Sequence, residues 1–327
     1  MYVYLDTNLF AEQAHFRDLD RIIHFFEDGK HQWVVESDED VEAILESEWL
    51  NSQGDRVRPI TAEFIERAFR DLVHTPINER KNRRTIHVNL NDNQHVISIK
   101  FALDYLNEPL YILVENEFSD KYFLDALFRC FRKKGKKIRK AFEHNWVQYY
   151  NAGGKTMISK IVEDRYVRQP LPERLFVFAD SDKNTPENTP KDTQSIIDLC
   201  EKLGVNYHVL YKREIENYLP KEALLQIPEA LHELTNTLFE LEPVQQDFYD
   251  LEKGLGNAKN DLFDDITNQQ RNILKLGYNQ AGYDPKKELH QLFNHSCITQ
   301  ENLLKKCKHQ DTPDELQQIL AKITNLL

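Results

Sequence analysis

The chain lacks the features that most directly reveal a membrane-spanning, secreted or repetitive protein. No apolar run comes near the roughly 18 residues that a membrane-spanning helix needs. The N-terminus has no basic stretch followed by a long apolar core, so we expect a cytoplasmic protein without a secretory signal or a membrane partner. Internal repeats, low-complexity tracts and linkers rich in glycine and serine are also missing. What remains is the composition of an ordinary globular protein, with 327 residues.

Cysteine is scarce as well, with four residues in the whole chain. None forms a Cys-x-x-Cys pair, and no histidine cluster stands beside them at zinc spacing. Structural zinc is therefore not expected, and no disulfide framework is suggested. Lone thiols of this kind are usually small apolar core residues.

Positive charge is in the minority, since the formal net charge is −12, which argues against a protein that coats polyanions in general. It is locally concentrated, because residues 129–140, RCFRKKGKKIRK, carry eight basic residues and no acidic one. A second basic patch comprises Arg80, Lys81, Arg83 and Arg84. Taken alone, such runs are more often solvated surface. Beside an acidic active site, we expect the first run to bind nucleic-acid phosphates. The residues that would do so are Arg132, Lys133, Lys134, Lys136 and Lys137.

Predicted strands and helices alternate through the middle of the chain. The strands are 110–115, 145–150, 174–179 and 207–211, and the helices between them are 120–132, 157–164 and 193–203. This alternation predicts an α/β fold in which helices flank a parallel sheet. We divide the chain into an N-terminal α/β accessory domain (1–108), the sheet domain (109–220) and a helical C-terminal extension (221–327).

Acidic and glycine residues follow the strands of this predicted sheet. Glu115 ends the first strand, Gly153-Gly154-Lys155 follows the second, and Asp180-Ser181-Asp182 follows the third. The carboxyl ends of parallel strands meet at one edge of a sheet, where such folds bind ligands. Carboxylates that converge there suit Mg²⁺ or Mn²⁺, and two such ions can activate water and stabilise the leaving oxygen of a phosphodiester.

Each of these features also has a plainer explanation. Asp180-Ser181-Asp182 is also compatible with a turn held by side-chain-to-backbone hydrogen bonds. Glu214 and Glu216 are compatible with simple pairing to the basic residues that precede them. The Gly-Gly-Lys-Thr segment is not a complete phosphate-binding loop, because Tyr149 stands where the first glycine is required, so ATP hydrolysis by this chain is not expected.

The order of four segments carries a specific resemblance. VENEFSD (114–120), NAGGK (151–155), FADSD (178–182) and KREIENYLP (212–220) resemble the Toprim domain of overcoming-lysogenization-defect nucleases, and above all the stand-alone Toprim effectors of bacterial anti-phage systems. The resemblance covers about a third of the chain. It implies that Glu115, Asp180 and Asp182 bind metal, that Glu216 also lies at the site, and that the glycine turn supplies Lys155.

Two departures from the family pattern leave alternatives open. Asn116 stands where the family usually has glycine, and Asp120 lies five residues after Glu115 rather than four. Either a bulge absorbs the extra residue, or Glu117 shares or replaces the role of Glu115. A later segment, FYDLEKG (248–254), also resembles a short motif of these effectors and suggests Lys253 as a second basic contact.

The N-terminal region resembles a different nuclease family. YLDTN (4–8) looks like the opening of a PIN-type ribonuclease, with Glu42 as a second acidic position and Asp92 in a later segment. The plainer explanation is that Asp6 and Asn8 cap the first turn after a strand.

We therefore expect a metal-dependent Toprim endonuclease with two Mg²⁺ or Mn²⁺ ions, acting on DNA or RNA, transfer RNA included. The resemblance further implies a toxic effector of anti-phage defence with a separately encoded ABC-type ATPase partner. One alternative is a PIN-type ribonuclease with a structural Toprim portion, and another is a non-enzymatic regulator of the ATPase. Assembly into a homo-oligomer is left open.

Overall fold

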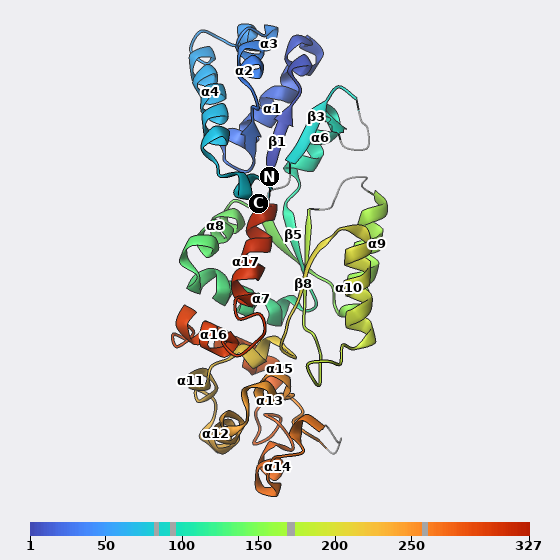
Figure 1. Cartoon of the computed structure of the whole chain (residues 1–327), viewed down its shortest axis with the longest axis vertical. Coiled ribbons are helices and arrows are strands. Elements are labelled where there is room, and N and C mark those ends of the chain that lie inside the picture. Colours follow the sequence, from blue (N-terminus) through green and yellow to red (C-terminus); the bar gives the residue numbers. More distant parts are fainter. Residues whose placement is uncertain (82–84, 92–95, 169–173, 257–260) are drawn as a thin grey trace. The chain divides into compact units, whose positions relative to one another are not determined.

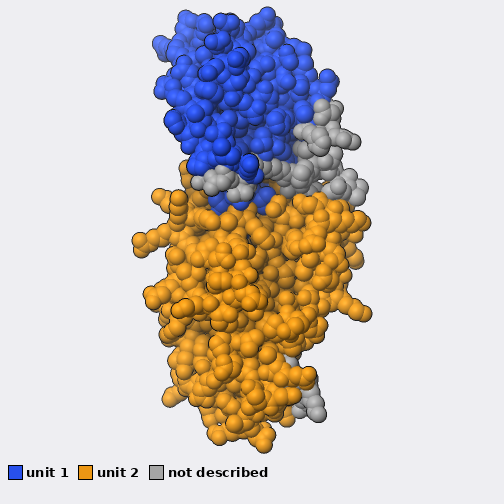
Figure 2. All heavy atoms as spheres, in the orientation of Figure 1, with its two compact units in different colours: residues 1–110, 143–146, 323–327 blue, residues 111–142, 147–322 orange. Residues whose placement is uncertain are grey.

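The structure is a computed structural model, and it describes residues 1–81, 85–91, 96–168, 174–256 and 261–327. It is an α/β fold with two four-stranded parallel sheets flanked by helices (Figure 1). The chain divides into two compact units (Figure 2). One contains residues 1–110, 143–146 and 323–327, and the other contains residues 111–142 and 147–322. Of the C-terminal extension predicted over 221–327, residues 221–322 thus belong to the same unit as the second sheet.

The first unit has a sheet in the order β2-β1-β3-β4, with all three strand pairs parallel. Its strands are β1 (Tyr2–Leu5), β2 (Gln32–Val34), β3 (Thr85–Asn89) and β4 (Val96–Ser98). Its helices are α1 (Phe16–Glu27), α2 (Asp38–Leu45), α3 (Glu48–Ser52), α4 (Arg58–His74), α5 (Ile77–Lys81) and α6 (Ile99–Asn107).

Two predicted helices of this unit are divided in the structure by serine caps. Apolar spacing predicts one helix over 40–49, but this helix breaks at Ser47, whose side chain accepts a hydrogen bond from the amide of Leu50 and starts α3. The same kind of spacing predicts a helix over 96–106, but this segment begins with the short strand β4, because Ser98 caps α6. Both predictions were wrong because they used apolar spacing alone and did not take account of the capping serine within each segment.

The second unit has a sheet in the order β6-β5-β7-β8. Its strands are β5 (Leu110–Val114), β6 (Val147–Asn151), β7 (Leu175–Ala179) and β8 (Asn206–Val209). The helices within the sheet region are α7 (Glu117–Cys130), α8 (Arg132–Glu143), α9 (Lys155–Arg168) and α10 (Lys191–Leu203). The later helices are α11 (Lys221–Leu224), α12 (His232–Glu240), α13 (Pro243–Phe248), α14 (Asn268–Leu274), α15 (Pro285–Glu288), α16 (Gln300–Cys307) and α17 (Glu315–Leu326).

The second sheet is covered on both faces. In Figure 1, α9 and α10 lie on one side of the sheet and α7 lies on the other. The central strand β7, LFVFA, is buried at every position, as expected of a parallel strand between two helical layers. Val177 packs in the core formed with α9 and α10, whereas Phe178 stacks on Phe123 of α7 at 5.9 Å between ring centroids.

Strand order determines where this sheet can bind a ligand. The chain runs from β5 to β6 on one side and then crosses to β7 on the other, so the order reverses between β5 and β7. Ligands of open α/β sheets bind at such a reversal, outside the carboxyl ends of the strands. β5 is followed by Glu115 and β7 by Asp180, so the acidic residues lie at this reversal.

The segment after the sheet is anchored to the sheet by buried polar contacts. The carboxylate of Glu315 accepts hydrogen bonds from the amide of Tyr211 (2.7 Å) and the hydroxyl of Tyr218 (2.5 Å), and it pairs with His208 (3.0 Å). Such a buried charge is stable only when it is fully bonded, so these contacts fix α17 against β8. None of the described helices combines the length and the apolar character that a membrane span requires.

Candidate active-site cleft

A cleft of about 340 Å³ opens at the carboxyl ends of β5 and β7 in the second unit. Among the described residues, many carboxylates line this cleft but a single ammonium group does, that of Lys286. The carboxylates belong to Glu115, Asp120, Asp180, Asp182, Glu214, Glu216 and Glu252. The three predicted metal ligands, together with Glu216 and Asp120, therefore line the same cleft.

The start of α7 positions the first pair of acids. Asn116 is the N-cap of this helix, and its side chain accepts a hydrogen bond from the amide of Phe118 (3.0 Å). Its backbone has φ −138°, which is extended and needs no glycine. Asp120 turns back from the first helical turn and accepts from the amide of Asn116 (2.9 Å). The capped turn thus brings Asp120 to the same cleft as Glu115 despite the extra residue between them.

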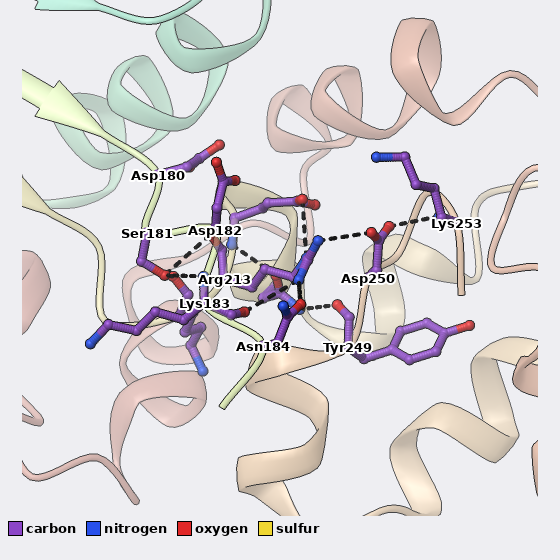
Figure 3. Close-up of polar contacts among 12 residues, drawn as sticks. Asp180, Ser181, Asp182, Lys183, Asn184, Arg213, Tyr249, Asp250 and Lys253 are labelled. Carbon is purple, nitrogen blue, oxygen red and sulfur yellow. Dashed lines mark hydrogen bonds and ion pairs between the residues drawn. The ribbon is translucent and has the colours of Figure 1, made fainter. Parts of the chain in front are cut away.

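The Asp180–Asp182 turn is built around a buried serine. Ser181 Oγ donates to the carbonyl of Lys212 (2.7 Å), and Asp182 N donates to the carbonyl of Arg213 (2.9 Å). Asp182 has φ +53°, a left-handed conformation that aspartate tolerates better than most residues. Figure 3 shows the Asp180 and Asp182 carboxylates on the same side of this turn. The plainer explanation given above, a turn held by hydrogen bonds, therefore describes the backbone, while both carboxylates are left to line the cleft.

Lys155 supports this turn from the protein side. It begins α9 after the Gly153-Gly154 turn, and its side chain is 7% exposed. Its Nζ donates to Asp182 Oδ2 (2.5 Å) and to Thr193 Oγ1 (3.1 Å). Because Lys155 does not line the cleft in this structure, it orients Asp182 rather than presenting its charge to a bound molecule.

The loop after β8 contributes the second pair of acids. Glu214 accepts from Arg213 Nε (3.2 Å), and Arg213 also donates to Asp250 (2.9 Å), as Figure 3 shows for the arginine and Asp250. The amide of Ile215 donates to Asp180 Oδ1 (3.1 Å), which ties this loop to the Asp180–Asp182 turn. Glu214 was expected only to pair with a basic neighbour. In the structure it pairs with Arg213 and also lines the cleft.

Burial dominates the electrostatics of the cleft. It raises the pKa of Glu115 to about 7, with Lys155 opposing the shift and Asp182 adding to it. It raises the pKa of Glu216 to about 8, with the negative charge of Glu214 as the next cause. The pKa of Asp180 is also well above its usual range because of burial and then the charge of Asp120. The negative charge of these carboxylates is therefore only partly balanced by the lysine and arginine side chains of the protein.

A divalent cation is the partner that this donor set fits. Among the described residues, Glu115 accepts no hydrogen bond through its carboxylate, so its oxygens are available to a ligand. Several carboxylate oxygens around one cleft are typical of hard ions such as Mg²⁺ and Mn²⁺. Over the same described ranges, no three Asp, Glu, His or Cys side chains already converge as a formed metal site. Coordination would therefore need side-chain movement, above all of Asp182, which is paired with Lys155.

The remaining predicted residues of the second unit lie outside the cleft lining. Glu117 is half-buried at the start of α7, and Lys253 is exposed, with its amide bonded to Asp250 (2.6 Å). The basic residues of α8 are exposed, while Gly135, Ile138 and Ala141 on its other face are buried. α8 follows the 14 residues of α7, which leads away from the cleft over roughly 20 Å. It can therefore contact only a distant part of a substrate held in the cleft.

The N-terminal candidates do not form a comparable site. Asp6 Oδ1 accepts from the amide of Asn8 (2.9 Å) and from its side chain (2.8 Å), and Asp6 Oδ2 accepts from Asn89 (3.0 Å). Asp6 is thus the cap of the turn that follows β1. Glu42 is exposed on α2, and Asp40 rather than Glu42 approaches the Tyr4 hydroxyl. Asp92, Arg83 and Arg84 lie outside the described residues.

Two cleft residues were missed from the sequence. Glu252 and Lys286 come from the segment after the sheet, and they form an ion pair with one another (3.3 Å). Glu252 lies in FYDLEKG, where the resemblance pointed to its neighbour Lys253 instead. Lys286 stands in no such motif, and α15 packs against Leu289–Asn294, which in turn packs on α7. No protein-family model, curated protein or solved structure matches the chain.

Proposed function

We propose that the chain is a metal-dependent endonuclease of the Toprim type, which hydrolyses phosphodiester bonds in DNA or RNA. The observation that carries the proposal is the shared cleft of Glu115, Asp180 and Asp182 at the point where the strand order reverses. The ordered resemblance of residues 109–220 to Toprim effectors supports it independently. The same resemblance makes a toxic role in anti-phage defence, with a separate ABC-type ATPase partner, part of the proposal.

In this proposal the carboxylates of the cleft bind the cations, and Lys155 positions one of these carboxylates. Glu115, Asp180 and Asp182 would hold the cations, with Glu216 at the same site. Bound Mg²⁺ or Mn²⁺ would supply charge stabilisation at the phosphate and a more acidic water. Lys155 keeps Asp182 oriented, and Thr193 holds Lys155 in turn.

Substrate contacts would come from two places at different distances. Lys286 is 69% exposed and lines the cleft, which supports a contact with a phosphate beside the scissile bond. The exposed basic face of α8, roughly 20 Å along α7, would hold the backbone about six nucleotides away, given 3.4 Å per nucleotide in one strand of a duplex. Phosphate contacts of this kind position a substrate and carry no sequence information.

The test is cleavage by the purified chain, with its partner ATPase where one is encoded, in Mg²⁺ or Mn²⁺. Substrates are single- and double-stranded DNA, total RNA and transfer RNA. The proposal predicts cleavage of at least one of them by the wild type and none by Asp180→Asn/Asp182→Asn. Asp192→Asn, which removes an exposed carboxylate from α10, should cleave as the wild type does. Equal cleavage by the double variant would exclude this cleft as the active site. No cleavage of any substrate by any form would favour the non-enzymatic alternative.

A further inference from the structure

A second cavity, of about 330 Å³, opens among α11, α12, α13 and α16. It shares no lining residue with the carboxylate cleft and has the opposite charge. Four basic side chains line it against one acid, in a protein whose net charge is −12. The basic residues are Lys221, Lys305, Lys306 and His309, and the acid is Glu222. A basic cavity in an acidic protein is suited to an anionic ligand.

Lys306 is the most constrained of these cations. Its Nζ donates to Gln246 Oε1 (3.2 Å) and lies 4.8 Å from the centroid of the Phe239 ring. Burial, and then the nearby charge of Lys212, lower the pKa of Lys306 to about 7. An anion in the cavity would compensate this cost, since an opposite charge nearby favours the charged form of an amine.

Buried polar contacts connect the wall of the cavity to the Asp180–Asp182 turn. His309 Nε2 lies 2.7 Å from Asp247 Oδ2, and the other oxygen of Asp247 pairs with Lys212. Asp247 and Lys212 are both fully buried, and Lys212 Nζ also donates to the carbonyl of Lys306 (2.9 Å). The carbonyl of Lys212 in turn accepts from Ser181 Oγ, at the centre of the Asp180–Asp182 turn.

We propose that this cavity binds the phosphoryl group of a small molecule, held by Lys305, Lys306, His309 and Lys221. A phosphate offers several charged acceptors to these donors, and charge-assisted bonds of this kind are the stronger ones. The volume is at the lower end for small-molecule sites, and Phe239, Pro220 and Pro243 leave an apolar wall for the organic part of a ligand such as a mononucleotide. The site is separate from the proposed nuclease cleft and does not depend on it.

The test is calorimetric titration of the full chain with inorganic phosphate and with AMP, at constant ionic strength and without divalent metal. The wild type should bind one of them saturably, and Lys305→Gln/Lys306→Gln should weaken that binding by about tenfold or more. Lys160→Gln/Lys202→Gln, which removes two exposed lysines from α9 and α10, should bind normally.

No saturable binding by the wild type, or undiminished binding by Lys305→Gln/Lys306→Gln, overturns the proposal. If that variant does not fold, Lys221→Gln on α11 is expected to show the same direction of loss. Binding of a short oligonucleotide but of neither small anion would assign the cavity to a nucleic-acid backbone and overturn the small-molecule ligand. The buried contacts of Lys212 between the cavity and the Asp180–Asp182 turn predict slower amide hydrogen exchange at Asp182 when phosphate is bound. Unchanged exchange at Asp182 would contradict this connection.

Discussion

Both sheets of this protein place an aspartate directly after a central strand, but the two carboxylates have different surroundings. Asp6, after β1, accepts three hydrogen bonds from asparagine donors at 2.8–3.0 Å. Asp180, after β7, accepts one from the amide of Ile215 (3.1 Å) and shares its cleft with six other carboxylates.

The comparison shows what separates a cap from a candidate ion site. An acid whose oxygens are already bonded by neutral donors has little left to offer a ligand. An acid that is buried among like charges carries an uncompensated cost, which a cation can remove. Position after a strand does not distinguish the two cases, whereas the number of bonded donors does.

The largest expected effect is on cleavage. Asp180→Asn should reduce the rate by at least about 10²-fold, the scale of losing one preorganised electrostatic group. Asp6→Asn should cleave within about twofold of the wild type, since an amide can keep most of the cap. Initial rates on one labelled substrate measure both. Loss of cleavage in Asp6→Asn alone would reverse the comparison and support a PIN-type active site.

The next effect is on thermal stability with metal. A ligand at 100 times its Kd stabilises the folded state by about 2.7 kcal/mol, which should raise the Tm of a 327-residue chain by about 4 °C. We expect this rise with Mn²⁺ in the wild type and in Asp6→Asn, and its loss in Asp180→Asn. Differential scanning calorimetry with and without Mn²⁺ provides the measurement. An equal rise in all three proteins would mean that the metal binds elsewhere.

A smaller effect is the pH dependence of the metal-free protein. Burial raises the pKa of Glu115 to about 7 and that of Glu216 to about 8. The folded state therefore keeps protons that the unfolded chain releases, and stability should fall as pH rises from about 4.5 to about 8. Glu216→Gln should flatten this fall, and Glu233→Gln, at an exposed position of α12, should not. Tm values across this range decide, and an unaltered slope in Glu216→Gln would contradict the electrostatic account.

The smallest expected effect comes from Lys286, the lysine that lines the cleft. Lys286→Ala should raise KM about threefold with little change in kcat, and lower the salt dependence of binding by about one released counterion. Lys287→Ala is the matched control, because Lys287 is 80% exposed, pairs with Asp284 and does not line the cleft. Equal effects of the two variants would show that Lys286 acts only through general charge.

The α/β fold with parallel sheets could be predicted because β7 is apolar throughout and helices alternate with the strands. Glu115, Asp180 and Asp182, which do share a cleft, could be predicted because strand ends are readable from the sequence. The cleft positions of Glu252 and Lys286 could not be predicted, because they depend on how the segment after the sheet folds back. Lys155 was predicted to reach this site from the glycine turn, but its bonds to Asp182 and Thr193 could not be predicted, because they depend on how α9 and α10 pack together.

A cation shared by Glu115, Asp180 and Asp182 is tested by titrating the chain with Mn²⁺ and measuring how much of the paramagnetic resonance signal of the free ion is lost. We expect saturable binding of one or two ions per chain, weakened by about tenfold or more in Glu115→Gln and unaltered in Glu117→Gln. Binding that is absent in the wild type, or that survives unchanged in both Glu115→Gln and Asp180→Asn, would contradict a cation held jointly by the acids of this cleft.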